Sequence, residues 1–184
     1  DDRRTVGGRG VCWHLSTGLG SSGAGGALTA RGSVGSYGGV NTGGLLSINT
    51  ETFLGALIAD NSGGGLDGLA ATSDGRLFAL ESSEGAQLLE LDPVTGNVLS
   101  SRFMGEGAGN ANDLAVQPGT DVLFSIDSSG QIFTINPSTG DSSYVSMAAG
   151  FGEGGAIAFA PNGTLYVAGY NDNASDDVLV ALDP

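Results

Sequence analysis

A turn phrase built on Asp or Asn followed by Pro returns along the chain at nearly constant spacing. It reads LDPVTG at 91–96 and INPSTG at 135–140, and the last three residues read LDP. SINTET at 47–52 occupies the same slot without proline. The Asp or Asn of the phrase stands at Asn49, Asp92, Asn136 and Asp183, and successive copies are 43, 44 and 47 residues apart. Such a regular interval predicts a chain made of repeated structural units.

Each unit contains a second shared segment that reads as a short apolar strand, a tight turn and an aromatic-bearing strand. Its copies are LDGLAATSDGRLFAL from Leu66, ANDLAVQPGTDVLFSI from Ala111 and GGAIAFAPNGTLYVAG from Gly154. A third strand leads into the proline phrase and a fourth follows it. We therefore predict that the phrase is the hairpin turn between these two strands. Its side-chain oxygens at Asp92, Asn136 and Asp183 are predicted to accept hydrogen bonds from turn N–H groups rather than to bind a ligand.

The composition agrees with a turn-rich all-β fold. The chain has 34 glycines, and its 40% apolar residues occur in short runs such as 77–80 and 122–126. Strand-only units with a period of about 40–50 residues predict β-propeller-like repeats of four-stranded antiparallel blades. We expect about four blades, or an open partial propeller. Complete units are predicted at 66–103 and 112–147, with a partial unit on either side.

The repeats resemble those of secreted and cell-surface bacterial and archaeal β-propeller proteins. In that family a segment of the type GLAFxP(D/N)GTLY precedes LYxI(D/N)PxTG, and the likeness here covers residues 44–184. The predicted division is a Gly-rich non-repeat segment at 1–43 followed by repeats at about 44–86, 87–130, 131–177 and a partial 178–184. The resemblance implies a binding platform, a surface or scaffold protein, or in some members a hydrolase or lactonase.

Charge is distributed unevenly. Residues 1–43 hold four Arg and two acidic residues, whereas the remainder holds two Arg and 18 acidic residues, giving a net charge of −14. Such a surface disfavours nucleic acid and anionic membranes and favours cations or basic partners. No apolar stretch approaches the length of a membrane span. We expect an extracellular or cell-surface location, in which the sequons at Asn162 and Asn173 are candidate glycosylation sites.

The last unit lacks a fourth strand, so its third strand is predicted to be an unpaired edge. Three alternatives stand open. The N-terminal stretch GALTARGSVGSY supplies the missing strand, or another copy supplies it in a dimer or filament, or the sequence is a fragment of a longer protein. Self-association through this edge is the partner interaction that we predict.

The N-terminal segment holds the one Cys and the one His of the chain, in the triplet Cys12, Trp13, His14. One Cys excludes an internal disulfide framework and a thiolate metal cluster. We interpret the triplet as a structural anchor. GLGSSGAGG lacks the following Lys and helix of a phosphate-binding loop, and we reject that reading.

Two sets of oxygen-bearing side chains are candidate Ca²⁺ sites, since Ca²⁺ takes six to eight oxygen ligands. The first lies in the segment GYNDNASDD, which does not fit the EF-hand spacing, and comprises Asn171, Asp172, Asn173, Asp176 and Asp177. The second precedes the innermost strands, at the expected channel mouth, and comprises Asp67, Asn112 and Asp113. The third repeat has Gly155 and Ala156 there, so this ring of oxygens is incomplete.

No catalytic constellation emerges from the sequence. There is no nucleophile elbow, and nothing selects a carboxylate pair among the 20 acidic residues. The leading hypothesis is a non-catalytic extracellular protein with a structural, self-assembling or binding role. The alternatives are a Ca²⁺-dependent propeller hydrolase or lactonase, and a monomeric ligand-binding module.

Overall fold

The structure is a computed structural model of the 184-residue chain. It describes residues 27–33, 43–49, 55–61, 66–81, 86–105, 108, 111–148, 151–171, 173 and 175–182. In this part of the chain every regular element is a β-strand, and all pairs of neighbouring strands are antiparallel. The predicted all-β class is confirmed.

The strands form four sheets, each ordered as the strands follow in the chain. The first contains β1 (Ala27–Ser33), β2 (Gly43–Asn49) and β3 (Gly55–Asn61). The second contains β4 (Leu66–Ala71), β5 (Leu77–Glu81), β6 (Gln87–Leu91) and β7 (Val98–Phe103). The third contains β8 (Ala111–Val116), β9 (Leu123–Asp127), β10 (Gln131–Ile135) and β11 (Ser142–Met147). The fourth contains β12 (Phe151–Phe159), β13 (Leu165–Asn171) and β14 (Asp176–Leu182).

The first strand does not have the role that one sequence-based alternative assigned to it. The stretch GALTARGSVGSY contains β1, which pairs with β2 in the first sheet, with Leu28 opposite Ile48 and Ala30 opposite Leu46. The prediction that this strand completes the last blade is therefore wrong for Ala27–Ser33. Pairing with the next strand of the chain closes a short loop, which costs less conformational entropy than closing a loop around the whole molecule.

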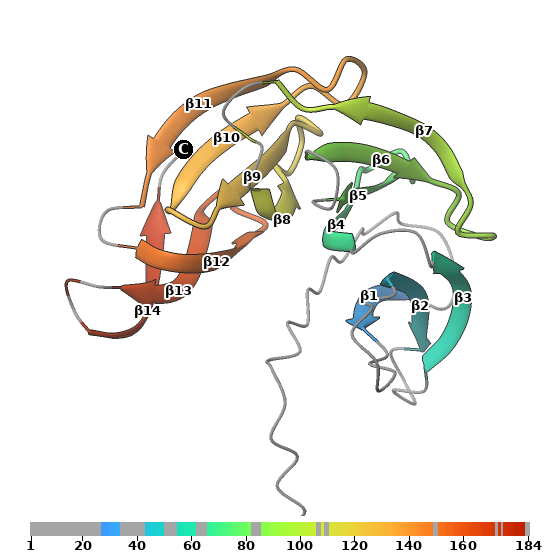
Figure 1. The fold of residues 1–184 in the computed structure, drawn as a ribbon, viewed down its shortest axis with the longest axis horizontal. Helices are drawn as coiled ribbons and strands as arrows, with labels where there is room; N and C mark the ends of the chain where they lie inside the picture. The colour runs from blue at the N-terminus through green and yellow to red at the C-terminus, as the bar shows by residue number, and fades with distance from the viewer. Residues whose placement is uncertain are drawn as a thin grey trace, which may run out of the picture.

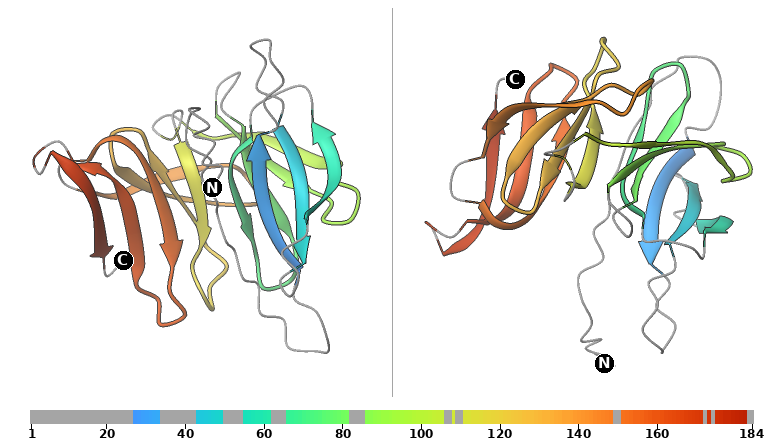
Figure 2. Two further views of the ribbon diagram at one scale, coloured as in Figure 1. Left: turned by 90° about the horizontal axis from the view of Figure 1, so that it is seen from below. Right: turned by 45° about the horizontal axis from the view of Figure 1, so that its top comes forward.

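The four sheets fan out along an arc that remains open on one side (Figure 1). The first sheet and the fourth sheet lie at its opposite ends, as the two turned views in Figure 2 also show. Strands β4, β8 and β12 are the inner strands, and β8 contacts both of the others. The arrangement places three sheet-to-sheet interfaces in series.

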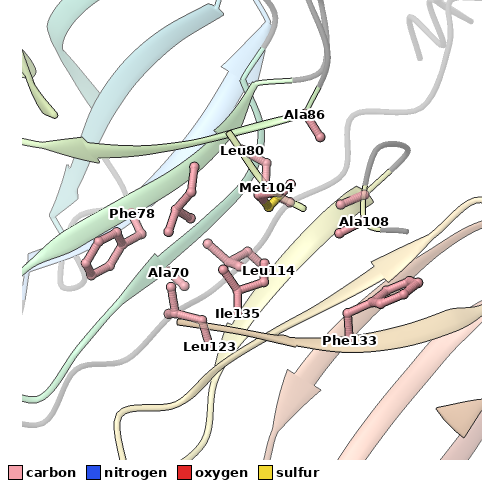
Figure 3. Close-up of a cluster of buried hydrophobic side chains, with 12 residues drawn as sticks. Ala70, Phe78, Leu80, Ala86, Met104, Ala108, Leu114, Leu123, Phe133 and Ile135 are labelled. Carbon is pink, nitrogen blue, oxygen red and sulfur yellow. The ribbon is translucent and has the colours of Figure 1, made fainter. Parts of the chain in front are cut away.

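Each interface is filled by its own apolar cluster, and alternation along the strands decides which side chain enters which cluster. On β5, Leu77 and Ala79 pack toward the first sheet, whereas Phe78 and Leu80 pack toward the third. In the central cluster the side chains of the second sheet point toward Leu114 and its neighbours on the third (Figure 3). The repeat period is thus a packing period, because the second and third sheets each bury both of their faces against a neighbouring sheet.

The proline phrase forms the predicted turn. The Asp92 Oδ1 accepts hydrogen bonds from the N–H groups of Val94 at 2.8 Å and Thr95 at 3.0 Å. These N–H groups, first that of Thr95, hold the pKa of Asp92 below its ordinary value. The Asn136 Oδ1 accepts the N–H of Ser138 at 2.9 Å in the next copy. The role of these two residues as turn formers is confirmed.

The glycine that ends the phrase also positions the turn against the preceding sheet. Gly96 has a φ of +72°, and a Cβ placed there would collide with Ala59 on β3. Gly140 has a φ of +82°, and a Cβ there would lie 2.6 Å from the carbonyl oxygen of Phe103 on β7. Each turn therefore packs on the outer strand of the sheet before it.

Candidate functional site

The three inner strands share an irregularity that a regular sheet would not have. A register shift occurs between Leu66 and Leu69 on β4, between Ala111 and Asp113 on β8, and on either side of Glu153 on β12. Bulges of this kind re-aim side chains at the rim of a sheet. The candidate residues Asp67 and Asn112 lie at the first two bulges, and both are half-buried. The structure thus gives these two residues equivalent places on neighbouring inner strands.

Asp113 joins two sheets. Its side chain is 8% exposed, and its Oδ2 accepts a hydrogen bond of 2.8 Å from the N–H of Ile157 on β12. Its Oδ1 accepts the N–H of Leu114 at 2.9 Å. Both carboxylate oxygens therefore accept hydrogen bonds from buried backbone N–H groups, which is a structural role.

The same position of the second sheet is occupied by Gly68. A Cβ at Gly68 would lie 2.6 Å from the Leu114 nitrogen, so the inner strands β4 and β8 approach one another more closely than any larger residue allows. In the next interface Asp113 fills this space and bonds to the equivalent N–H. The two interfaces solve one packing problem with different residues.

The predicted ring of oxygens has no third member. Gly155 lies at the β12 bulge, and a Cβ there would already lie 3.0 Å from the Ile126 side chain. In the described part of the chain no three His, Cys, Asp or Glu side chains gather closely enough to hold a metal ion. The side-chain oxygens at the inner-strand site are therefore those of Asp67, Asn112 and Asp113.

The second candidate set lies at the hairpin between β13 and β14. Asn171 and Asp176 face one another in the strand register. The Asn171 Oδ1 accepts the N–H of Asn173 at 2.9 Å, and the Asp176 Oδ1 accepts the N–H of Asp177 at 2.9 Å. Because successive strand residues point to opposite faces, the structure does not bring Asp176 and Asp177 together.

The sequons are placed differently. Asn162 is exposed in the turn between β12 and β13, where its Oδ1 accepts the N–H of Thr164 at 3.2 Å. Asn173 is exposed in the hairpin that follows β13. Asp172, Asp183 and the triplet Cys12, Trp13, His14 lie outside the described residues.

One polar network escaped the sequence reasoning. On the second sheet Arg76 binds Glu90 through two nitrogen–oxygen pairs, at 2.8 and 3.0 Å. Arg102 approaches the same carboxylate at 3.7 Å and donates to the carbonyl of Ser138 in the third sheet at 2.8 Å. The Arg76 hydrogen bond, as the largest cause, lowers the pKa of Glu90 and raises that of Arg76. The sequence feature that could have indicated this network is that Arg76 and Arg102 are the two Arg residues beyond residue 43, among 18 acidic residues.

The last sheet differs from the two central ones at its outer side. In those sheets the third strand, β6 or β10, has an outer neighbour, β7 or β11. The equivalent third strand of the fourth sheet is β14, which is the edge strand among the described residues. This is the feature of the site region that most resembles an open binding surface.

The comparisons with solved structures decide the fold. A Bacteroides thetaiotaomicron protein of unknown function matches with a TM-score of 0.57 at 12% identity, over 85% of this chain and 39% of that one. Virginiamycin B lyase from Staphylococcus aureus matches with a TM-score of 0.53 at 10% identity, over 94% and 55%. An auxiliary nutrient binding protein from Bacteroides thetaiotaomicron matches with a TM-score of 0.56 at 14% identity, over 91% and 40%.

The fold is a partial β-propeller. The solved neighbours are propeller-like, and the sheets described here do not close into a ring. The chain spans between 39% and 55% of the lengths of these three structures. No family model matches the chain, and no curated protein matches it. At these identities the likeness concerns the fold alone.

Proposed function

We propose that this partial propeller is a non-catalytic extracellular or cell-surface protein with a structural, self-assembling role, which it performs through the edge of its last blade. The observation that carries the proposal is the position of β14, which among the described residues is the edge strand of its sheet, whereas β6 and β10 each pair with a further strand. An edge strand presents N–H and C=O groups that an added strand can pair. Among the described residues, no helix is long and apolar enough to cross a membrane.

The acidic surface supports the location. A net charge of −14 favours solubility and repels anionic membranes and nucleic acids. In an oxidising extracellular environment the sequon at Asn173 would be exposed to a glycosylating enzyme. Expression through a secretory pathway and mass measurement of the peptide containing Asn173 tests this modification.

The edge is tested by hydrogen exchange at β14. Amide N–H groups that point away from β13 exchange rapidly in a single copy and become protected when a strand is added. We expect protection in β14 to rise with protein concentration, whereas β10, which is already paired on both sides, should show no concentration dependence. Constant exchange in β14 at concentrations where the protein is assembled would exclude strand addition there.

A second candidate function is Ca²⁺-dependent binding or hydrolysis at the inner strands. It is favoured by the equivalent bulge positions of Asp67 and Asn112 on neighbouring strands. Calorimetric titration with Ca²⁺ should show binding that is lost in Asp67→Asn and retained in Asp176→Asn. Hydrolysis of lactone substrates should then be chelator-sensitive and Asp67-dependent. Absence of heat in the wild-type titration would remove this candidate.

A further inference from the structure

The turn between β12 and β13 contains a pair of residues that occurs once in the sequence, Asn162 followed by Gly163. Every other Asn is followed by a residue other than glycine. Asn is a thermolabile residue type, because its side-chain amide is open to attack by the backbone nitrogen of the next residue. Glycine hinders that nitrogen least, since it has no Cβ. The pair is therefore where such a reaction meets the least steric hindrance along this chain.

The structure places this pair at the exposed tip of a hairpin. Asn162 is exposed, and a Cβ added at Gly163 would meet no atom within 4 Å in the described part of the chain. A Cβ added at Gly96 or Gly140 would instead collide with the outer strand of the sheet before it. The β12–β13 turn thus does not pack on another described sheet, and its opening leaves the interfaces between sheets intact.

The second sheet contains the same turn with an acid in place of the amide. In the β4–β5 turn and in the β12–β13 turn, the glycine N–H donates to the carbonyl three residues earlier, at 3.0 and 2.9 Å. The two glycines have positive φ, +86° at Gly75 and +89° at Gly163. Asp74 is therefore the counterpart of Asn162.

The two side chains are held differently. The Thr72 hydroxyl donates to the Asp74 Oδ1 at 2.5 Å, and this hydrogen bond, as the largest cause, lowers the pKa of Asp74. Asp74 is therefore a carboxylate, which a nitrogen does not attack. Ala160 stands in the place of Thr72 and has no hydroxyl. The Asn162 Oδ1 accepts the N–H of Thr164 at 3.2 Å, so its side chain is less tightly held than that of Asp74.

We infer that Asn162 is a site of spontaneous deamidation, in which the Gly163 nitrogen displaces the side-chain nitrogen as ammonia. The Gly163 nitrogen forms a bond to the Asn162 Cγ and gives its proton to solvent. The bond between Cγ and Nδ2 breaks, and Nδ2 takes up a proton and leaves as ammonia. Water then opens the succinimide ring at one of its two carbonyl carbons. The product is Asp on the original backbone, or isoaspartate, in which the backbone continues through Cγ.

The reaction requires local opening of the turn. The Gly163 N–H donates to the Ala160 carbonyl at 2.9 Å, and this bond breaks before the nitrogen turns toward Cγ. Hydrogen bonds at an exposed hairpin tip open at low free-energy cost. We therefore expect the folded chain to react more slowly than the unfolded chain. The rate should rise with pH, because the attacking nitrogen has to lose its proton.

The two products affect the hairpin differently. Asp reproduces the residue that the second sheet already has at Asp74. Isoaspartate lengthens the backbone between β12 and β13, where the N–H of Ala160 bonds to the carbonyl of Thr164 at 2.9 Å, and should weaken that bond. Both products lack the Nδ2 of Asn162, to which a glycan would be attached. Deamidation and glycosylation therefore exclude one another at this residue.

The test compares two Asn–Gly pairs within one folded chain. Asp74→Asn creates a second pair, in a turn that retains the Thr72 hydroxyl. The variant is incubated in water enriched in heavy oxygen, at neutral and at mildly alkaline pH, and the two turn peptides are analysed by mass spectrometry. We expect Asn162 to convert several-fold faster than the new pair. Its products should contain heavy oxygen and include isoaspartate.

The reciprocal variant is Ala160→Thr, which adds the hydroxyl that Thr72 supplies in the second sheet. It should slow the deamidation of Asn162 by about tenfold. Thr72→Ala combined with Asp74→Asn should raise the new pair to the rate of Asn162. Asn173 is exposed but followed by Ala, and as the matched control it should remain an amide. Circular dichroism melting curves separate a slower reaction from a changed fold.

Three outcomes would overturn the inference. Retention of the Asn162 amide in the folded chain, while the urea-unfolded chain deamidates, would show that the turn protects the pair. Products that contain Asp without isoaspartate would exclude the succinimide. Equal rates in the wild type and in Ala160→Thr would exclude the missing hydroxyl as the cause. These measurements are independent of the proposed self-assembly, which is tested at β14.

Discussion

At the scale of single residues, one position of the repeat is filled by different residue types in different copies. Asp113 and Gly68 occupy equivalent positions, yet one bonds to the next inner strand and the other lets it approach. Asp92 and Asn136 both accept hydrogen bonds from N–H groups of their turns, so a carboxylate and an amide are interchangeable at this turn position. The first position requires a hydrogen-bond acceptor or a small volume, and the second requires an acceptor.

Two turn glycines allow the energetic cost of a left-handed backbone to be measured separately from the cost of a steric collision. Gly75 and Gly96 both have positive φ, but a Cβ at Gly75 meets nothing within 4 Å, whereas one at Gly96 collides with Ala59. Gly75→Ala should destabilise the protein by about 1–2 kcal/mol through the left-handed backbone alone. Gly96→Ala should add about 1–3 kcal/mol of overpacking. Urea unfolding measures both, and equal losses would contradict a contact between the turn and β3.

At the scale of elements, sheets are joined by hydrogen bonds as well as by apolar packing. Asp113→Ala removes an acceptor from the buried N–H of Ile157, and we expect a loss of about 1–3 kcal/mol of unfolding free energy. Asp113→Asn keeps one side-chain oxygen and should lose less. The Ile157 amide should also exchange faster in the alanine variant. An unchanged exchange rate would mean that β8 and β12 are held without this bond.

The Glu90 network predicts how stability depends on pH. The pKa of Glu90 lies below its ordinary value of 4.5, chiefly because of the hydrogen bond from Arg76. A depressed folded-state pKa contributes stability above the unfolded pKa, and that contribution is lost as the pH falls through the folded value. The unfolding free energy should therefore fall below about pH 4.5.

Two variants isolate this contribution. In Glu90→Gln and in Arg76→Gln the decrease of unfolding free energy with acidification should be shallower than in the wild type, as measured by urea titrations across the pH range. Asp92 also has a lowered pKa, so part of the acid sensitivity should remain in both variants. A wild-type slope in Glu90→Gln would show that the ion pair is too well solvated to contribute.

At the scale of the whole molecule, the place of a residue along the arc decides its energetic weight. Leu88 and Leu179 stand at the same repeat position, but one is buried between sheets and the other is exposed. In dilute monomer, Leu88→Ala should cost about 2–5 kcal/mol. Leu179→Ala should stay within about 0.5 kcal/mol. Thermal unfolding at low concentration measures both, and similar costs would mean that Leu179 is covered within one chain.

Much of this architecture could be predicted from the sequence, because the same pattern of apolar strands and turns occurs several times along the chain. Short apolar runs, turn glycines and the Asp or Asn of the proline phrase determine strands and turns locally, and these predictions are confirmed at Asp92, Asn136 and the two complete sheets. The sheet to which β1 belongs was not predicted, because the strand is flanked by Gly-rich segments and the turn phrase of the first unit, SINTET, lacks proline. Leu28 and Ala30 nevertheless repeat the alternation of Leu77 and Ala79.

The sequence by itself determined the strand content, the turn chemistry and the acidic charge, since these depend on neighbours along the chain. Only the tertiary structure decided which sheet β1 joins, that the oxygens of Asp113 serve backbone donors, and that Leu179 is the exposed copy of a buried position. The physical reason is that these facts depend on contacts between sheets. Identical local patterns are compatible with a covered or an open face, and the arrangement of the sheets in space selects between them.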